Sequence, residues 1–299
     1  MAEITLLDGG MGQELVARSG DEPTPLWATR VMIDHPGMVR DIHADYFAAG
    51  ATVATANTYA IHHDRLERFG LDPWFHALHL RALSEAHEAR AQNGGRGRIA
   101  GSLGPLEASY RPELTPPVAE AAVKYAEIAR IHAAHVDLLL IETISSLDLA
   151  EGAVIGAQEA GVPVWLSVSV DDGDGSRLRS GERVADLARV LKAGRVDAVL
   201  ANCSVPEAME DALRALATLG RPFGAYANGF THITGNFLKD APTVRELTHR
   251  TDLSPARYAE FVLGWVAMGA SIVGGCCEIG PAHIRHLHAE LAAAGHRVA

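Results

Sequence analysis

Short runs rich in Val, Ile, Leu and Ala recur along this chain, and a longer stretch with helical spacing follows each of them. This alternation is typical of a parallel sheet whose strands are joined by crossover helices. Eight such units in 299 residues predict an α/β fold, a single (β/α)8 TIM barrel. The predicted strands cover residues 4–8, 52–57, 99–103, 137–142, 164–170, 198–203, 223–228 and 271–275.

Helical stretches are clearest over residues 36–49, 118–135 and 255–268, where apolar positions share one face. Asp34 and Ser254 stand where residues that cap helix N-termini are expected, and Ser254 directly precedes a proline. Two connections are long, residues 171–182 and 229–253, and long loops in compact domains often close over a functional site. We therefore ask whether the second of them is a lid.

Composition favours one packed domain. Hydrophobic residues make up 48% of the chain and charged residues 21%, which is close to globular averages and supplies a core. No break in composition divides the sequence, so residues 1–299 are predicted to form one barrel domain. The chain also ends soon after the eighth predicted strand, which leaves no room for a folate- or cobalamin-binding domain.

Charge and hydropathy restrict the partners. The formal net charge of −11 would repel phosphate backbones and anionic lipid, so neither nucleic acid nor a membrane is an expected partner. No apolar run approaches the roughly 18 residues of a membrane span. The N-terminus shows no secretory signal pattern, which favours a cytoplasmic protein that binds small molecules. An oligomer is compatible with the sequence.

Polar residues stand at the ends of the predicted strands. In a (β/α)8 barrel, the carboxyl ends of all strands meet at one mouth, where the active site lies. Side chains that are far apart in sequence are therefore expected to face one pocket. These residues are Asp8, Asn57, Glu142, Asn202, Cys203, Asn228, Cys276 and Cys277, and Ser169 lies within the fifth predicted strand.

The three cysteines of the chain are all among these residues. Cys203, Cys276 and Cys277 would present three soft sulfur ligands to Zn2+ and leave a fourth position open, as catalytic zinc sites do. Because two of them are adjacent, a framework of paired disulfides is disfavoured, and we expect free or metal-bound thiols. A substrate thiol entering the open position would lose its proton and could attack a methyl group. The alternative without a function is that the cysteines are small hydrophobic residues buried in the core.

Two other patterns are interpreted as structural. The Gly9 to Gly12 segment lacks the spacing of a dinucleotide loop and the Lys-Ser/Thr of a nucleotide loop, so we interpret it as a tight turn. Histidines also occur in pairs at ligand-like helical spacing, but on predicted outer helices, where surface positions are expected. The pairs are His76/His79, His132/His135 and His283/His286.

The sequence resembles the homocysteine S-methyltransferase family over most of its length. The GGCC motif at 274–277 is the most specific part of the resemblance. After this motif the chain reads Glu278-Ile279-Gly280, where many relatives have Arg-Thr-Thr. The other matching segments are LDGGMGQEL at 7–15, PLW at 25–27, DYFAAGA at 45–51, TANTY at 55–59, AGSLGP at 100–105, Glu142-Thr143, Ser180-Gly181, Asn202-Cys203, Pro281 and His283-Ile284.

The resemblance implies a role for each part of the mouth. It implies that Cys203, Cys276 and Cys277 bind zinc, and that Glu142 receives the amino group of homocysteine. Asp8 and the backbone of the turn that contains Gly10 and Met11 would lie nearby. Tyr59 resembles a position that in some members approaches the metal or the substrate. Three further polar residues would orient substrate or satisfy loop backbone: Asn57, Ser169 and Asn228.

These expectations combine into one function. A small sulfonium or ammonium donor, with S-methylmethionine or S-adenosylmethionine favoured over betaine, would give its methyl group to homocysteine and yield methionine. One alternative is methyl transfer to or from a different thiol, a selenol or an osmolyte-like sulfonium. The other is a non-catalytic barrel that stores zinc or senses redox state through its paired cysteines.

Overall fold

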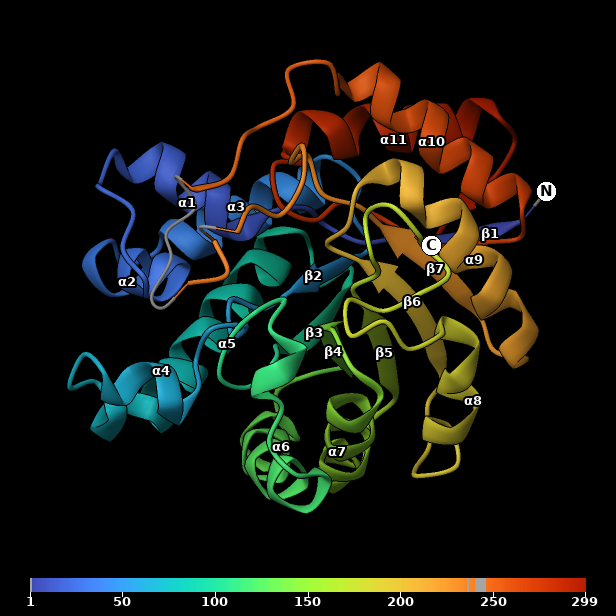
Figure 1. Cartoon of the computed structure of the whole chain (residues 1–299). Coiled ribbons are helices and arrows are strands. Elements are labelled where there is room, and N and C mark those ends of the chain that lie inside the picture. Colours follow the sequence, from blue (N-terminus) through green and yellow to red (C-terminus); the bar gives the residue numbers. More distant parts are fainter. Residues whose placement is uncertain (1, 236, 240–245) are drawn as a thin grey trace.

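The computed structural model describes residues 2–235, 237–239 and 246–299, and it shows a parallel sheet surrounded by helices (Figure 1). All eight predicted strands are present, and each pairs in parallel with its sequence neighbours. The prediction of a (β/α)8 barrel is therefore confirmed. The strands are β1 Glu3–Leu6, β2 Val53–Thr55, β3 Arg98–Leu103, β4 Leu138–Ile144, β5 Val164–Val168, β6 Ala198–Asn202, β7 Phe223–Tyr226 and β8 Ile272–Val273.

The barrel closes between its first and second strands. Leu7 forms a parallel bridge with Val53, and the Thr52 N–H donates to the Leu6 carbonyl at 2.7 Å. On its other side β1 pairs with β8. A further two-residue strand, β9 (Arg297–Val298), pairs in parallel with β1 at its N-terminal end. This strand was not predicted, because two residues at the end of an Ala-rich helix carry no recognisable strand pattern.

The connecting helices lie outside the sheet (Figure 1). They are α1 Met11–Ser19, α2 Trp27–Asp34, α3 Met38–Ala48, α4 His63–Glu67, α5 Phe75–Gln92, α6 Val118–His132, α7 Leu147–Ala157, α8 Leu187–Val190, α9 Met209–Leu216, α10 Pro255–Ala267 and α11 Pro281–Ala293. Short 3-10 turns cover Asp72–Trp74, Pro112–Leu114, Gln158–Ala160, Val184–Asp186, Pro206–Ala208 and Ala217–Leu219. Among the described residues, no helix is long and apolar enough to cross a membrane.

The two predicted helix caps differ in outcome. The Ser254 hydroxyl accepts the Arg257 N–H at 3.2 Å, which confirms it as the cap of α10. The prediction for Asp34 is wrong, because Asp34 is the last residue of α2 and α3 starts four residues later. The Glu85 carboxylate, from α5, instead accepts the N–H groups of Gly37 and Arg40 at the start of α3. A cap supplied by a distant helix leaves no local sequence signal.

Side chains that alternate along the strands fill the barrel interior with apolar residues. The same inward rows place polar residues at the carboxyl end of the barrel. Successive side chains of a strand point to opposite faces, so Leu138, Leu140 and Glu142 of β4 share one face. The two leucines pack in an apolar cluster with Trp165, Leu200 and other residues from strands around the barrel. Glu142 continues this inward row at the carboxyl end, where the apolar layer stops. The core thus positions a carboxylate at the barrel mouth.

The interpretation of the histidine pairs as surface residues is wrong for His79 and His132. Both side chains are fully buried between α5 and α6, and His132 Nε2 lies 3.0 Å from His79 Nδ1. Their partners in each pair, His76 and His135, retain solvent exposure. Helical periodicity shows which positions share a face, but it does not show that a neighbouring helix will bury a histidine on that face.

Candidate metal and substrate site

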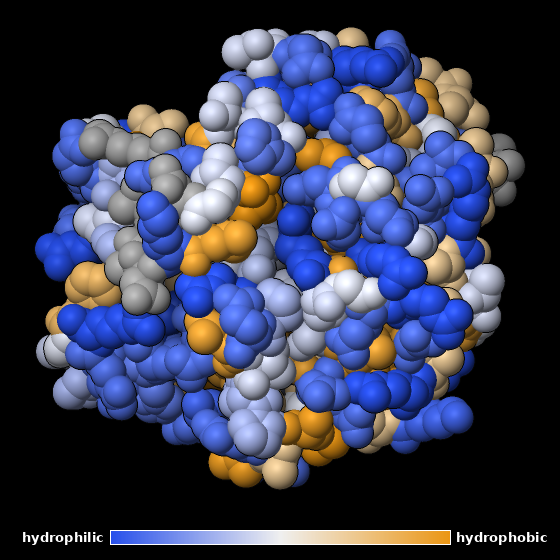
Figure 2. Space-filling view, viewed as in Figure 1, coloured by the Kyte–Doolittle hydropathy of each residue, from blue (hydrophilic) through white to orange (hydrophobic). Residues whose placement is uncertain are grey.

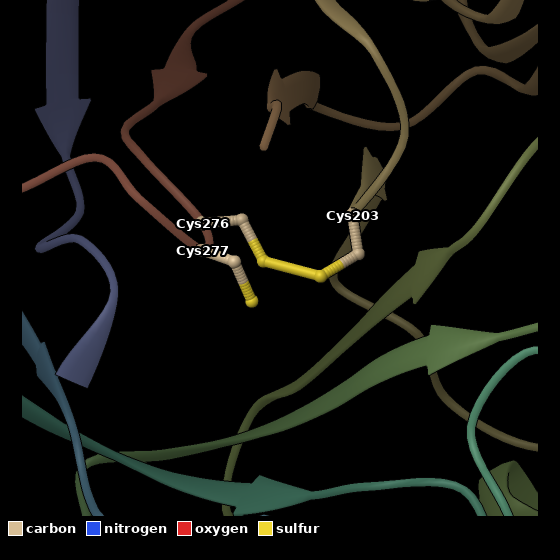
Figure 3. A group of neighbouring side chains, drawn as sticks. All are labelled: Cys203, Cys276 and Cys277. Carbon is tan, nitrogen blue, oxygen red and sulfur yellow. A yellow bond between two sulfur atoms is a disulfide. The ribbon is translucent and has the colours of Figure 1, made fainter. Parts of the chain in front are cut away.

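The three cysteines meet at the barrel mouth (Figure 3). Cys203 follows β6 and the pair Cys276-Cys277 follows β8, and their three sulfur atoms all lie within 4.8 Å of one another. Cys203 and Cys276 are joined as a disulfide, and Cys277 is free and buried. The expected convergence is present, while the disulfide differs from the expectation that all three cysteines are free or metal-bound.

Backbone hydrogen bonds hold the cysteine segments in place. The Cys276 N–H donates to the Ala227 carbonyl at 2.9 Å, and the Cys277 carbonyl accepts the Gly229 N–H at 2.8 Å. Cys203 has a φ of 51° and Glu278 a φ of 66°, a left-handed conformation that is unfavourable for residues with a side chain. Such conformations persist where the surrounding structure enforces them, commonly at functional sites.

The donor set fits a thiophilic metal ion. Cys203 and Cys277 are 4% and 8% exposed, so a metal here would be shielded from bulk water. Burial, the largest cause, and then the nearby Glu278 raise the pKa of the Cys277 thiol to about 12. A thiolate at this position therefore requires an adjacent positive charge. Three soft sulfur ligands suit zinc and related metals and leave room for another ligand.

The cysteines line a cavity of about 910 Å3, its mouth included, and most predicted site residues line it too. Figure 2 shows apolar side chains gathered near the middle of this face among hydrophilic surroundings. Of the residues that the sequence placed at the mouth, Asn202, Ser169 and Asn228 are not part of the described lining. The lining includes Asp8, Gly10, Met11, Asn57, Tyr59, Glu142, Cys203, Cys276 and Cys277.

Glu142 is a buried carboxylate held by two hydroxyl groups. Ser102 Oγ donates to one carboxylate oxygen at 2.5 Å, and the Tyr226 hydroxyl donates to the other at 3.2 Å. Burial raises the pKa of Glu142 to about 6, against the lowering effect of these two hydrogen bonds. The carboxylate is therefore oriented and ionised near neutral pH, and the described lining of the cavity contains no Lys, Arg or His side chain to neutralise it.

Asp8 is the second carboxylate of the cavity. It accepts hydrogen bonds from the Thr55 N–H at 2.7 Å and from the Thr55 hydroxyl at 2.9 Å. Burial is the largest cause that raises its pKa to about 7, and the negative charge of Glu142 adds to this rise. Both oxygens of Asp8 thus accept hydrogen bonds from Thr55 at the end of β2. The Asp8 carboxyl group lines the same cavity as Glu142.

The remaining predicted substrate residues have protein partners. Tyr59 Oη lies 2.7 Å from Ser109 Oγ, and Asn57 Nδ2 donates to the Ala28 carbonyl at 3.4 Å. Ser169 Oγ donates to the Cys203 carbonyl at 3.3 Å from behind the cavity. Asn228 Oδ1 accepts the Phe230 N–H at 3.2 Å and so shapes the loop after β7. Through these contacts, Ser169 and Asn228 stabilise the loops that form the barrel mouth.

Aromatic residues cover the cysteines, and apart from Trp27, which lies in the matching PLW segment, the sequence did not single them out. Tyr110 comes from the loop after β3 and has a φ of 62°, while Phe230 and Phe237 come from the loop after β7. Trp27 stands edge-on to Tyr59, with ring centroids 6.4 Å apart. The only signal in the sequence was the presence of aromatic residues in segments without regular periodicity.

The two long loops behave differently. Arg179, in the segment 171–182, stacks over the Tyr110 ring at 4.9 Å and pairs with Asp172, so this loop supports the aromatic cover. In the segment 229–253, Phe230, Phe237 and Leu247 line the cavity. Residues 236 and 240–245 of this segment lie outside the described residues, and the question whether the segment is a lid falls partly on them.

Comparison with known proteins decides the family. The model of the homocysteine S-methyltransferase family matches residues 5–291. The chain belongs to this family. The homocysteine S-methyltransferase of Escherichia coli K12 is 31% identical to it, and the match covers 96% of this chain and 95% of the relative. The selenocysteine methyltransferase of Astragalus bisulcatus is 26% identical, with 95% and 91% covered.

A solved structure of the same family has the same fold. The metallated form of the homocysteine methyltransferase MmuM from Escherichia coli superposes with a TM-score of 0.79, at 27% identity and 96% coverage of both chains. The oxidized form of that protein also gives a TM-score of 0.79, at 28% identity. This chain thus has the same fold as both forms of that protein.

Proposed function

We propose that this chain transfers a methyl group to the thiol of homocysteine and forms methionine, with zinc held by Cys203, Cys276 and Cys277. The observation that carries the proposal is that three cysteine sulfurs within 4.8 Å of one another share a cavity with a buried, oriented carboxylate. Zinc bound there would supply a Lewis acid that lowers the pKa of an incoming thiol while leaving its sulfur nucleophilic.

The cavity residues would bind the amino-acid part of homocysteine. Glu142 would accept hydrogen bonds from the ammonium group, because an ionised carboxylate forms strong charge-assisted bonds with it. Asp8 would add negative charge on the same side. The first turn of α1 has no side-chain cap, so its N–H group at Met11 would face the substrate carboxylate, whereas the Gly10 N–H is bonded to the Ile279 carbonyl. Tyr59 and Asn57 would complete the wall of the substrate cavity. Ser169 and Asn228 would help indirectly, by holding the loops after β6 and β7 in place.

The cavity favours a cationic methyl donor. No Lys, Arg or His is among the described residues that line it, whereas Trp27, Tyr59, Tyr110, Phe230 and Phe237 supply aromatic faces or edges. A sulfonium or quaternary ammonium group is attracted to aromatic faces and to nearby carboxylates. We therefore propose S-methylmethionine or S-adenosylmethionine as the donor, with betaine as the next candidate.

Two alternatives have specific support. A selenol or a different thiol as the acceptor, or demethylation of an osmolyte-like sulfonium, uses the same site, and a relative named as a selenocysteine methyltransferase favours the selenol. A redox-sensing or zinc-storing barrel is favoured by the disulfide between Cys203 and Cys276. Turnover separates the classes, because a sensor or store would bind metal without consuming a methyl donor.

The chemistry of the site supports a proposal for the cellular compartment. A centre made of three thiolates requires reduced cysteines, so we propose a cytoplasmic enzyme. We also propose that residues 1–299 act as one homocysteine-binding domain. Small-molecule substrates account for the cavity without a macromolecular partner.

The deciding experiment measures methionine formation by the reduced, zinc-loaded protein. Homocysteine is offered with S-methylmethionine, S-adenosylmethionine or betaine in separate reactions, and the product is identified by mass spectrometry. We expect methionine with one of the sulfonium donors, and the Cys203→Ala variant should give none while remaining folded. If no donor supports turnover although zinc stays bound, the assigned acceptor or donor is wrong.

A further inference from the structure

The first turn of α1 packs directly on the turn that carries Cys276 and Cys277. The Gly10 N–H donates to the Ile279 carbonyl at 3.0 Å. A Cβ atom added at Gly10 would lie 3.2 Å from Cys277 Cα and 2.9 Å from the Cys276 carbonyl oxygen, so only a glycine allows this approach. Residues three apart on a helix share a face, which directs the Gln13 side chain toward the same turn.

The Gln13 amide is buried without a partner. Neither its Nε2 nor its Oε1 completes a hydrogen bond of good geometry with any described residue, although both atoms are shielded from solvent. Gln13 and Cys277 line the same cavity. An unsatisfied buried polar group is unfavourable, so a native protein keeps one where something else supplies the partner.

The group that this amide faces is the thiol of Cys277, the free and buried cysteine of the cluster. A neutral thiol is a weak acceptor, whereas a thiolate carries a full negative charge. An amide N–H that is buried and idle beside this sulfur would therefore find a strong acceptor in a metal-bound thiolate. Figure 3 shows Cys277 beside the joined pair, with its own sulfur unbonded.

The other member of the cysteine pair has a comparable neighbour. Asn202 Nδ2 donates toward Cys276 Sγ at 4.0 Å. The Asn202 amide also bonds to Thr143 and Ser167, so its role is divided. Gln13 has no such competing partner among the described residues, which leaves the Cys277 sulfur as its acceptor.

We propose that Gln13 is a positioning residue whose Nε2–H donates to the Cys277 thiolate when the three cysteines hold a metal ion. The inference rests on the proposed function, because it requires a metal centre. The hydrogen bond fixes the orientation of the Cys277 side chain and withdraws electron density from its sulfur. Outer hydrogen bonds of this kind commonly change metal affinity by 10- to 100-fold when removed.

The test compares Gln13→Leu, which removes the donor at similar volume, with Gln92→Leu as the matched control. Gln92 is exposed at the end of α5 and far in sequence from every cavity residue. Gln13→Ala serves as a second variant, in case the leucine does not pack. Thermal unfolding of each reduced full-length chain first establishes that it folds. Zinc affinity is then measured by competition with a chromophoric chelator, and the sulfur-to-cobalt charge-transfer band is recorded after loading with Co2+.

We expect both Gln13 variants to bind zinc about tenfold more weakly and to shift the charge-transfer band to lower energy, since the sulfur loses a hydrogen bond. Gln92→Leu should match the unaltered protein in both readouts. Unchanged affinity and spectrum in folded Gln13 variants would overturn the inference, as would a loss confined to homocysteine binding. If the unaltered chain binds no metal, the proposed function fails together with the inference. If only Gln13 is without effect, the proposed function stands.

Discussion

Asn202 and Thr143 hydrogen-bond to each other twice across the barrel mouth. The Thr143 N–H donates to Asn202 Oδ1 at 2.9 Å, and Asn202 Nδ2 donates to Thr143 Oγ1 at 2.9 Å. Thr143 directly follows Glu142, and Asn202 directly precedes Cys203. The pair therefore joins the residue proposed to anchor the substrate to a residue proposed to bind the metal.

Removing this link should weaken both functions. Asn202→Ala leaves the buried Thr143 N–H without its partner, which should lower the free energy of unfolding by about 2 kcal/mol. Because the loops after β4 and β6 lose their common support, the KM for homocysteine and zinc affinity should both worsen. Urea unfolding and chelator competition measure the two effects. If the free energy of unfolding falls but zinc and homocysteine bind normally, the Asn202–Thr143 pair has only a structural role.

The charge of Glu142 is predicted to bind the substrate ammonium. Glu142→Gln keeps one oxygen that can accept from a hydroxyl and gains an amide N–H that can donate to the oxygen of the other hydroxyl, so the contacts with Ser102 and Tyr226 and the fold should persist. Loss of a charge-assisted hydrogen bond costs about 1.5–3 kcal/mol, which corresponds to roughly 10- to 100-fold weaker homocysteine binding. Isothermal titration calorimetry of the zinc-loaded protein tests this. Glu67→Gln, at an exposed position outside the cavity, is the control, and an equal Kd in both variants contradicts the assignment.

The aromatic cover is predicted to select the donor. Tyr110→Leu removes one ring from the cavity and retains apolar bulk, so it should raise the KM for a sulfonium donor by about 5- to 30-fold through loss of an attraction of about 1–2 kcal/mol. The KM for homocysteine should change little. Steady-state kinetics with each substrate varied in turn gives both values. A variant that impairs homocysteine and leaves the donor unaffected would move Tyr110 to the acceptor side.

Buried histidines should make the fold sensitive to acid. Burial lowers the pKa of His132 to about 3 and that of His62 to about 4, from an ordinary value of 6.5. Because the folded state binds their protons less readily than the unfolded chain, their contribution is present above about pH 6.5 and is lost as the pH falls toward the folded values. Each of these histidines can increase the slope of unfolding free energy against pH by at most about 1.4 kcal/mol per pH unit.

Unfolding in urea at about pH 7.5 and about pH 5 measures this slope. His132→Phe should reduce the loss of unfolding free energy between the two conditions. The control is His76→Phe on the exposed side of α5. Equal pH dependence in the two variants would show that the buried histidine does not control acid stability.

The sequence predicted the parts of this molecule that repeat or that stand at regular positions. Strand alternation and the convergence of strand ends located all eight barrel strands and brought Cys203 to the Cys276-Cys277 pair. The cap that Glu85 provides to α3 and the burial of His132 depend on contacts between helices distant in sequence. Gln13 was visible within a matching motif, but its unpartnered amide is a property of three-dimensional packing.

The aromatic cover illustrates the same limit at the site. Tyr110 reaches the cavity from an irregular loop in which its own φ is positive, and Arg179 holds it there from another loop. Neither position follows a periodic pattern. Such residues are found only when the loops after different strands are seen together.

X-ray absorption at the zinc edge, on the reduced protein before and after addition of homocysteine, tests the central claim most directly. The account predicts three sulfur ligands in the protein alone and a fourth when homocysteine is added, with Cys277→Ala reducing the count by one. A sulfur count below three in the unaltered protein, or no change on adding homocysteine, would contradict the proposal that the three cysteines hold zinc for the substrate thiol.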